Sequence, residues 1–411
     1  MTNLTRILAL TALLTSATHA AQIDVDTDSV RHGSYLARMS DCIACHTAPR
    51  GEENAGGLPM STPLGKVYST NITPDKKTGI GNYSYEDFSR ALRQGVAKEG
   101  HSLYPAMPYT SFARINDADM HDLYIYFMRG VKPVKQVNHD SDIPWPLSIR
   151  WPLKLWRWMF HDDNQYQANA SKSVQWNRGA YLVQGMAHCG TCHTPRGGAF
   201  QEVALTGEKP GYLTGARLAG WFAGNLTGDA REGLGNWSAE ELVAYLQTGR
   251  NRYTAAFGPM AEVVHHSSQH INAADLSAIA EYIKSLPGAG AAKVAPVRTG
   301  AGLFFENCAT CHMTNGQGHE RVVPTLAGSS AVMARDATSL IRVVLEGGVN
   351  ASTRHIAWEY NMPGYAQQMN DQEVANVLTY MRQSWGNAAS PVATDDVAKI
   401  RKIIIEEPKR Q

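Results

Sequence analysis

All six cysteines of the chain fall into three copies of one short pattern. In each copy, two residues separate the cysteines and a histidine follows the second cysteine at once. The copies are Cys42-Ile43-Ala44-Cys45-His46, Cys189-Gly190-Thr191-Cys192-His193 and Cys308-Ala309-Thr310-Cys311-His312. This is the pattern to which haem c is attached. On a helical turn the two sulfurs can form thioethers with the two haem vinyl groups, and the histidine then lies under the iron. The sequence therefore predicts three covalently bound haem c groups.

The same spacing argues against other uses of paired cysteines. A structural zinc site needs four ligands and usually joins one such pair to a second pair downstream. No further cysteines exist to complete such sites. A thioredoxin-like redox motif requires neither the histidine nor three copies. The even cysteine count would permit disulfide bonds, but disulfides do not account for the repeated histidine.

The N-terminus has the three-part layout of a secretory signal peptide. Arg6 precedes the apolar stretch 7–14, and a run of small and polar residues ends at Ala20. The apolar stretch is shorter than the roughly 20 residues needed to cross a bilayer. We therefore expect residues 1–20 to be removed and the protein to be exported. The net charge is +1, so we expect no nucleic-acid partner.

The first two motif regions repeat one another beyond their cysteines. Asn71-Ile72-Thr73-Pro74-Asp75 corresponds to Asn225-Leu226-Thr227-Gly228-Asp229, and Gly79-Ile80-Gly81-Asn82-Tyr83-Ser84 corresponds to Gly233-Leu234-Gly235-Asn236-Trp237-Ser238. Both blocks are separated by the same offset along the chain. A constant offset through several blocks indicates two copies of one domain.

Each of the three motif regions closes with an apolar helical pattern. Apolar residues recur three positions apart within 120–126, 276–282 and 374–380, which places each set on one helix face. A short helical stretch also precedes each cysteine motif, and an apolar helix there can cover a porphyrin. The sequence therefore predicts an all-α protein of three tandem class I cytochrome c domains joined by irregular linkers.

The expected layout follows from the motifs and the composition of the segments between them. It is a signal peptide (1–20), a first cytochrome c domain (21–131), a Trp-rich linker (132–175), a second domain (176–287), a short linker (288–298), a third domain (299–386) and a C-terminal tail (387–411).

A haem iron that only transfers electrons needs a second axial ligand besides its histidine. Each predicted domain offers one methionine beside a proline, before the closing helix. These are Met107, Met260 and Met362. The adjacent proline fixes the backbone of the segment that must deliver the sulfur to the iron. The rivals are Met369 for the third iron and, for bis-histidine ligation, His101, His265, His266 and His270.

The segment 144–160 is unusually aromatic for a linker. It contains Trp145, Trp151, Trp156 and Trp158, interleaved with Arg150, Lys154 and Arg157. An ordinary linker only has to span the distance between two domains and is usually polar. Residues of this kind therefore either pack inside the molecule or bind a partner or a membrane surface. Since Trp and Arg are favoured anchors of interfaces, we predict that the segment is at least partly a docking surface for a partner subunit.

The motifs together make the chain resemble the cytochrome c subunits of membrane-associated bacterial dehydrogenases for alcohols, gluconate, sugars and aldehydes. The resemblance covers nearly the whole chain after residue 20. It rests on the three haem motifs, on Ser69-Thr70-Asn71-Ile72-Thr73-Pro74-Asp75, on Leu103-Tyr104-Pro105-Ala106-Met107-Pro108-Tyr109 and on the Trp-rich run.

This resemblance carries functional expectations. It implies that electrons arrive from a flavoprotein or quinoprotein dehydrogenase subunit and leave to ubiquinone or another acceptor. It implies a periplasmic location, peripheral to the inner membrane. It also implies the axial pairs His46/Met107, His193/Met260 and His312/Met362.

A haem enzyme such as a peroxidase is the competing class of function. Such an enzyme needs an open iron position for its substrate, whereas three candidate methionines are available for three irons. No dinucleotide fingerprint or other cofactor motif occurs, so we expect a partner subunit to oxidise the organic substrate.

Overall fold

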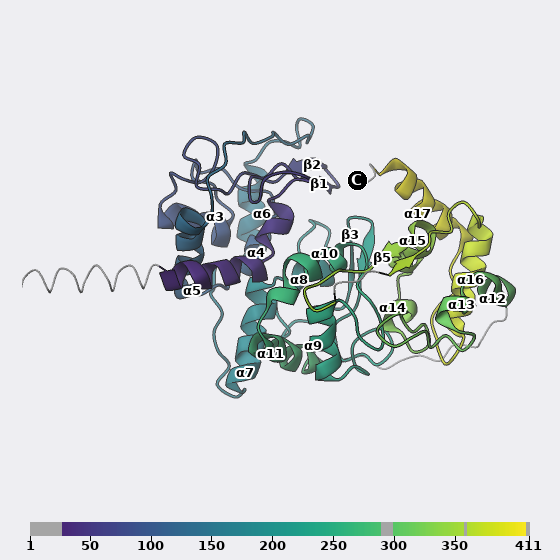
Figure 1. The fold of residues 1–411 in the computed structure, drawn as a ribbon. Coiled ribbons are helices and arrows are strands. Elements are labelled where there is room, and N and C mark those ends of the chain that lie inside the picture. The colour runs from purple at the N-terminus through teal and green to yellow at the C-terminus, as the bar shows by residue number, and fades with distance from the viewer. Residues whose placement is uncertain (1–26, 289–298, 357–359, 408–411) are drawn as a thin grey trace, which may run out of the picture.

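The computed structural model describes residues 27–288, 299–356 and 360–407 (Figure 1). The predicted signal peptide, residues 1–20, lies outside these residues. Figure 1 shows the chain advancing across the molecule in sequence order, from helices α3–α5 through α7–α11 to α12–α17. Among the described residues, no helix is both long enough and apolar enough to span a membrane.

The first third of the chain begins with helical residues 27–39. The elements that follow are α2 (Cys42–Cys45), β1 (Pro59–Thr62), β2 (Gly65–Tyr68), α3 (Tyr85–Gln94), α4 (Tyr109–Phe112), α5 (Asp117–Ile125) and the π-helical turn η1 (Tyr126–Gly130). Helix α6 (Pro152–Phe160) lies in the segment between the first two repeats.

The second and third parts follow a similar order, with a first helix, a short cysteine-motif helix, a strand pair and a closing helix. The second part contains α7 (Val174–Tyr181), η2 (Leu182–Met186), α8 (Gly190–His193), β3 (Ala216–Leu218), β4 (Trp221–Ala223), α9 (Ala239–Thr248), α10 (Pro259–His266), η3 (Ser268–His270) and α11 (Ala273–Lys284). The third contains α12 (Ala301–Asn307), α13 (Ala309–His312), α14 (Ser330–Met333), α15 (Thr338–Glu346), β5 (Gly348–Val349), β6 (Asn361–Met362), α16 (Asp371–Gln383) and α17 (Thr394–Glu406).

In each part, the first helix meets the closing helix at a glycine. A Cβ atom on this glycine would collide with the backbone of the closing helix, so the two helices touch backbone to backbone. The pairs are Gly33 with Asp122, Gly179 with Ala278 and Gly300 with Asn376. Only glycine permits so close an approach. In the third part the contact residue, Gly300, is the N-cap of α12, whereas Gly302 within that helix has open space around it.

The predicted all-α fold class is wrong, because strands occur between the helices. Within the described residues β1 pairs with β2, β3 with β4 and β5 with β6, each as a two-stranded antiparallel sheet. The registers include Met60 opposite Val67 and Gly348 opposite Met362. The segments between the cysteine motifs and closing helices are long, and their backbone groups need hydrogen-bond partners that short strand pairs supply. Runs of two to four residues carry too little alternation to be recognised in a sequence.

The buried side chains connect the first two repeats. One hydrophobic cluster includes Leu36 and Met120 of the first repeat together with Leu182 and Leu276 of the second. A separate cluster fills the third part and includes Val397 and Ile400 of α17, so the C-terminal helix belongs to that core. The domain limits expected from the sequence remain a prediction.

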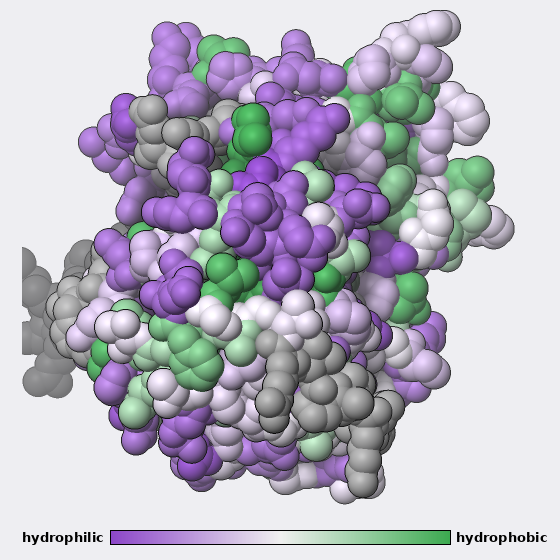
Figure 2. Space-filling view, turned by 90° about the vertical axis from the view of Figure 1, so that its right-hand side faces the viewer, coloured by the Kyte–Doolittle hydropathy of each residue, from purple (hydrophilic) through white to green (hydrophobic). Residues whose placement is uncertain are grey.

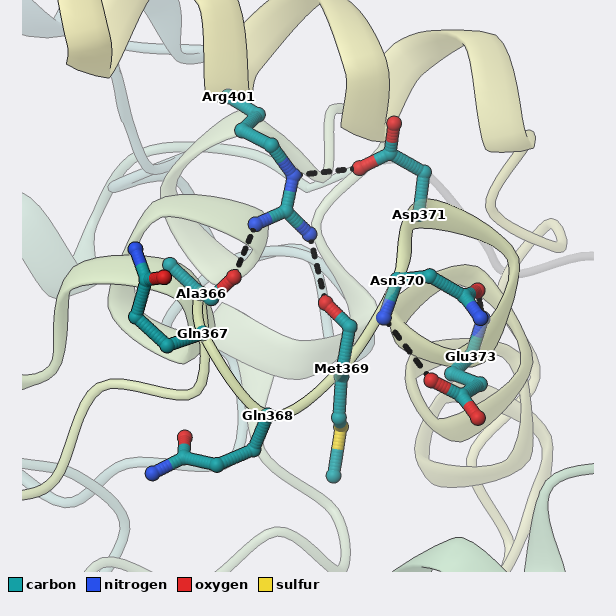
Figure 3. A pocket seen from close by; sticks show the side chains of 8 residues that line it. All are labelled: Ala366, Gln367, Gln368, Met369, Asn370, Asp371, Glu373 and Arg401. Atoms are coloured by element: carbon teal, nitrogen blue, oxygen red, sulfur yellow. Dashed lines mark hydrogen bonds and ion pairs between the residues drawn. The ribbon is translucent and has the colours of Figure 1, made fainter.

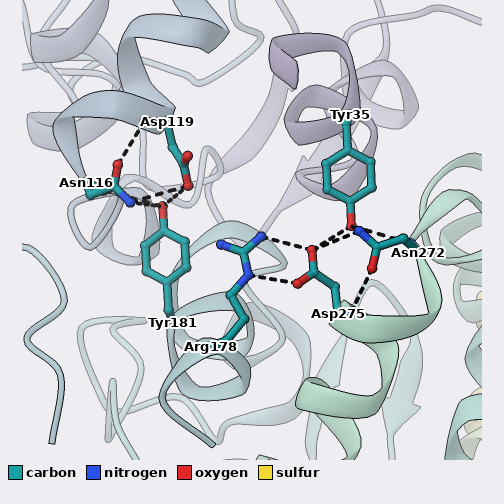
Figure 4. Close-up of polar contacts among 7 residues, drawn as sticks. All are labelled: Tyr35, Asn116, Asp119, Arg178, Tyr181, Asn272 and Asp275. Carbon is teal, nitrogen blue, oxygen red and sulfur yellow. Dashed lines mark hydrogen bonds and ion pairs between the residues drawn. The ribbon is translucent and has the colours of Figure 1, made fainter. Parts of the chain in front are cut away.

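Polar contacts between the two repeats are reciprocal (Figure 4). The Tyr35 hydroxyl donates to Asp275 Oδ2 over 2.6 Å, and the Tyr181 hydroxyl donates to Asp119 Oδ2 over 2.6 Å. Each tyrosine lies on the first helix of one repeat, and each aspartate lies on the closing helix of the other. The two repeats therefore face one another through equivalent surfaces, as in a two-fold symmetric dimer.

Candidate haem sites

Three short helices carry the cysteine motifs. Helices α2, α8 and α13 each follow the first helix of their part of the chain. No disulfide bond joins any of the six cysteines, all of which lie in the described part of the chain, and Cys45 and Cys311 are exposed. A helical turn places two cysteines three positions apart on one side, which is the arrangement that covalent attachment of a haem requires.

The three motif histidines are held in the same way. The Nδ1 atom of His46 lies 2.7 Å from the carbonyl oxygen of Thr70. His193 Nδ1 lies 2.6 Å from the carbonyl oxygen of Gly224, and His312 Nδ1 lies 3.0 Å from that of Pro324. A carbonyl oxygen only accepts, so Nδ1 must carry the proton and Nε2 keeps its lone pair.

This geometry fits a haem iron. A metal-binding histidine usually donates its other ring nitrogen to a carbonyl or carboxylate, which fixes the tautomer and the ring orientation. Burial lowers the pKa of His46, His193 and His312, and the hydrogen bond to the carbonyl opposes this effect only in part. The neutral imidazole is the form that binds a metal. His46, His193 and His312 would therefore hold iron through Nε2, and the six cysteines would hold the porphyrins.

The sequence repeat noted above builds the loops that fix the first two histidines. Thr70 and Gly224, whose carbonyls accept from the imidazoles, directly precede Asn71 and Asn225. Each asparagine accepts from the backbone N–H two residues later, over 2.9 Å from Thr73 and 2.8 Å from Thr227. This local turn sets the direction of the preceding carbonyl. The repeated Asn-x-Thr block is visible in the sequence, but only the structure shows that it orients the carbonyl groups that bind His46 and His193.

The three candidate methionines lie on three different kinds of segment. Met107 lies in the loop before α4, Met260 in the first turn of α10, and Met362 in β6. All three are half-buried. Met107 packs against the cluster of the first two repeats, Met260 against a small cluster with Ala256, and Met362 against the cluster of the third part. Their assignment as axial ligands stays a prediction.

The rival ligands occupy other surroundings. Met369 is 4% exposed and lies within the core of the third part. His265 Nδ1 lies 3.1 Å from the carbonyl oxygen of Ser352, and its ring contacts His266. His101 lies near Glu99 on the surface. Met369 is therefore a core residue in this structure, whereas Met362 lies at the edge of the same core.

The regions around the three sites adjoin one another through the second part of the chain. Helix α10, which begins with Pro259 and Met260, packs against α2 of the first motif. Met260 also packs against the small cluster that contains Ala351 of the third part. A Cβ atom on Gly348 would collide with the ring of Phe257. Gly348 pairs with Met362 of the third site. The segment that contains Phe257 and Met260 therefore contacts elements of both the first and the third site.

A surface pocket lies apart from these motifs, between residues 366–373 and α17 (Figure 3). Figure 3 shows the Arg401 guanidinium turned toward the chain rather than outward. It donates to the carbonyl oxygens of Ala366 and Met369 and to Asp371 Oδ1, over 2.6 to 2.8 Å. These bonds connect α17 to residues 366–371 at the start of α16, so Arg401 stabilises the packing of the C-terminal helix.

Comparison with known proteins agrees with the motifs. Residues 297–385 match the family described as cytochrome c. The chain is 48% identical to the gluconate 2-dehydrogenase cytochrome c subunit of Pantoea cypripedii, over 91% of this chain and 89% of the relative. It is 44% identical to the cytochrome c subunit of the quinone alcohol dehydrogenase of Gluconobacter oxydans, over 96% and 86%. It is 36% identical to the fructose dehydrogenase cytochrome subunit of Gluconobacter japonicus, over 91% and 82%. The chain therefore belongs to the family of dehydrogenase cytochrome c subunits, and its cofactor is covalently bound haem c.

Proposed function

We propose that the chain carries three haem c groups and relays electrons from a dehydrogenase subunit to ubiquinone or another respiratory acceptor. The observation that carries the proposal is the identical setting of His46, His193 and His312. Each imidazole donates from Nδ1 to a backbone carbonyl, which leaves Nε2 available for an iron. A motif kept only for packing would not need the same ring orientation three times.

The contacts around α10 support transfer within the chain. This helix packs against the first attachment helix, and Met260 shares a cluster with Ala351 of the third part. Chain segments near all three sites therefore meet around one helix. We propose that the second site exchanges electrons with both of the others.

The relatives support the identity of the electron donor. Those compared are named as cytochrome subunits of gluconate, alcohol and fructose dehydrogenases. We propose that this chain likewise receives electrons from a flavoprotein or quinoprotein subunit, in the periplasm and at the periphery of the inner membrane. The competing function, a peroxidase-like haem enzyme, is not favoured, because the relatives compared are named as cytochrome subunits of dehydrogenases.

The test is rapid mixing of the haem-loaded chain with its substrate-reduced dehydrogenase subunit. We expect the absorbance change to correspond to the reduction of all the haem c in the chain. Subsequent addition of a soluble ubiquinone should reoxidise it. A chain that stays oxidised beside an active, reduced dehydrogenase would contradict the proposal.

A further inference from the structure

Helix α6 exposes several large apolar side chains to solvent. Trp158 is 80% exposed, and Trp151, just before the helix, is 68% exposed. Leu155 and Met159 are each about half exposed. Positions 151, 155 and 158 are spaced by four and three residues, so they share one helix face. In a globular protein such a stripe normally faces the core.

The opposite face of α6 is anchored to the rest of the molecule. Trp156 Nε1 donates to the carbonyl oxygen of Ala199 over 2.8 Å, and its ring meets Tyr109 edge to face. Arg157 donates to Ser102 Oγ over 3.3 Å. One part of the Trp-rich segment therefore packs inside the molecule, and another part is exposed and free to bind a partner or a membrane. Trp156 belongs to the packed part, and its contacts hold the outward face in a fixed orientation.

The outward surface continues into the loop before the helix. Trp145 is 81% exposed, and Leu147 and Ile149 are 50% and 40% exposed. Residues 143–161 include no aspartate or glutamate, while Lys154 is exposed among the apolar side chains. We call Trp145, Leu147, Ile149, Trp151, Leu155, Trp158 and Met159 the outer tryptophan face. Figure 2 shows one face of the molecule, on which hydrophilic residues cover much of the surface and hydrophobic patches lie between them.

We propose that the outer tryptophan face lies on a lipid bilayer, with its side chains in the interfacial layer. This inference rests on the proposed location at the inner membrane and names the surface that makes the contact. Tryptophan is enriched at the membrane–water interface, and surface-bound helices combine Trp and Leu with basic residues. A bilayer also accepts a set of exposed apolar side chains with one lysine among them. A protein interface normally surrounds its apolar centre with a hydrogen-bonded polar rim.

The position of α6 connects this surface to the chemistry. Arg150 lies over the ring of Tyr104, and Tyr109 contacts Trp156. These two tyrosines flank the loop that contains Met107. Lipid contact through α6 would therefore hold the first haem site beside the bilayer, where ubiquinone is dissolved.

The test uses the haem-loaded full chain without its dehydrogenase, mixed with vesicles of phosphatidylethanolamine and phosphatidylglycerol. We compare the native chain with the double variant Trp151→Gln/Trp158→Gln. The matched control is Val174→Gln, because Val174 is 89% exposed at the start of α7, outside the outer tryptophan face. We expect the native chain and the control to sediment with the vesicles. The double variant should lose roughly tenfold or more of its partitioning, with unchanged haem spectra.

Two results would overturn the proposal. One is a native chain that does not sediment with the vesicles. The other is a double variant that partitions with the vesicles as the native chain does; if that variant also no longer co-purifies with the dehydrogenase subunit, this face is a protein interface. Reduction by the dehydrogenase in solution is measured on the same variants. If the dehydrogenase does not reduce the native chain, the proposed function is contradicted, but the result of the vesicle assay is unaffected.

Discussion

Tyr35 and Asp275 lie 240 positions apart in the chain, yet the tyrosine hydroxyl donates to the aspartate carboxylate over 2.6 Å. Arg178 donates to the same carboxylate over 2.8 and 2.9 Å (Figure 4). The aspartate therefore receives partners from the first helices of both repeats. Because the side chain of Asp275 is only 9% exposed, this network joins the two repeats through a carboxylate that has little contact with water.

The first prediction concerns this contact. Tyr35→Phe removes a hydroxyl that hydrogen-bonds a largely buried carboxylate, and we expect the free energy of unfolding of the paired repeats to fall by about 1–3 kcal/mol. Tyr181→Phe is the matched variant, because Tyr181 makes the equivalent bond to Asp119. Denaturant titration followed by tryptophan fluorescence measures both. Native stability in both variants would show that the reciprocal bonds contribute nothing.

A pH dependence follows from the same carboxylate. Burial by itself raises the pKa of Asp275, but hydrogen bonds from Arg178 and Tyr35 outweigh burial and hold the pKa below its ordinary value. An acid with a lowered pKa in the folded state stabilises the protein above the unfolded pKa of about 3.9, and this contribution is lost as the pH falls through the folded value. Asp275→Asn should therefore destabilise the protein at neutral pH and reduce the loss of stability on acidification. Denaturation midpoints across the acid range measure this, and an unchanged pH profile would contradict the assignment.

Several features of the site could be predicted from the sequence because they are local. The cysteine motifs, the repeated Asn-x-Thr turn and the closing helices each depend on residues close together in the chain. The strand pair that contains Met362 could not be predicted, since β5 and β6 are two residues each and lie twelve positions apart. Neither could the bond from Tyr35 to Asp275, because nothing local in either repeat specifies which surface meets the other.

The Trp-rich segment shows a different limit of sequence reasoning. Its apolar spacing is the same whether a helix buries that face or exposes it. Only the hydrogen bond from Trp156 to Ala199 and the ring contact with Tyr109 reveal which side of α6 faces the molecule.

The third prediction concerns the glycine crossings. Gly179→Ala would place a Cβ against the carbonyl group of Ala278, so the first and closing helices of the second repeat must separate. We expect a loss of at least about 1–3 kcal/mol, as for other overpacked contacts. Gly302→Ala is the control, because it lies in α12 with open space around it. There the better helix propensity of alanine should stabilise by up to about 1 kcal/mol. Thermal denaturation of the haem-loaded variants measures the difference, and equal effects would contradict the crossing geometry.

The fourth prediction is the haem content. Because all six cysteines lie in attachment motifs and all three motif histidines are held alike, matured protein should contain three haem c groups per chain. Intact mass and a pyridine haemochrome assay count them independently. The variant Cys189→Ala/Cys192→Ala should lose one haem and leave the other two. A native count below three in fully matured protein would contradict the assignment.

The last prediction concerns the axial methionines. If Met107, Met260 and Met362 each supply a thioether to iron, the oxidised protein is low-spin and shows a near-infrared sulfur-to-iron band. Replacing any one of them with alanine should remove about a third of that band, on the assumption of three equivalent sites. The matched control is Met369→Leu, because Met369 is a buried core residue and leucine keeps most of its volume. That variant should retain the band even if it is less stable. A band lost with Met369 but retained with Met362 would reverse the third assignment, and a native protein without the band would indicate histidine at the distal position.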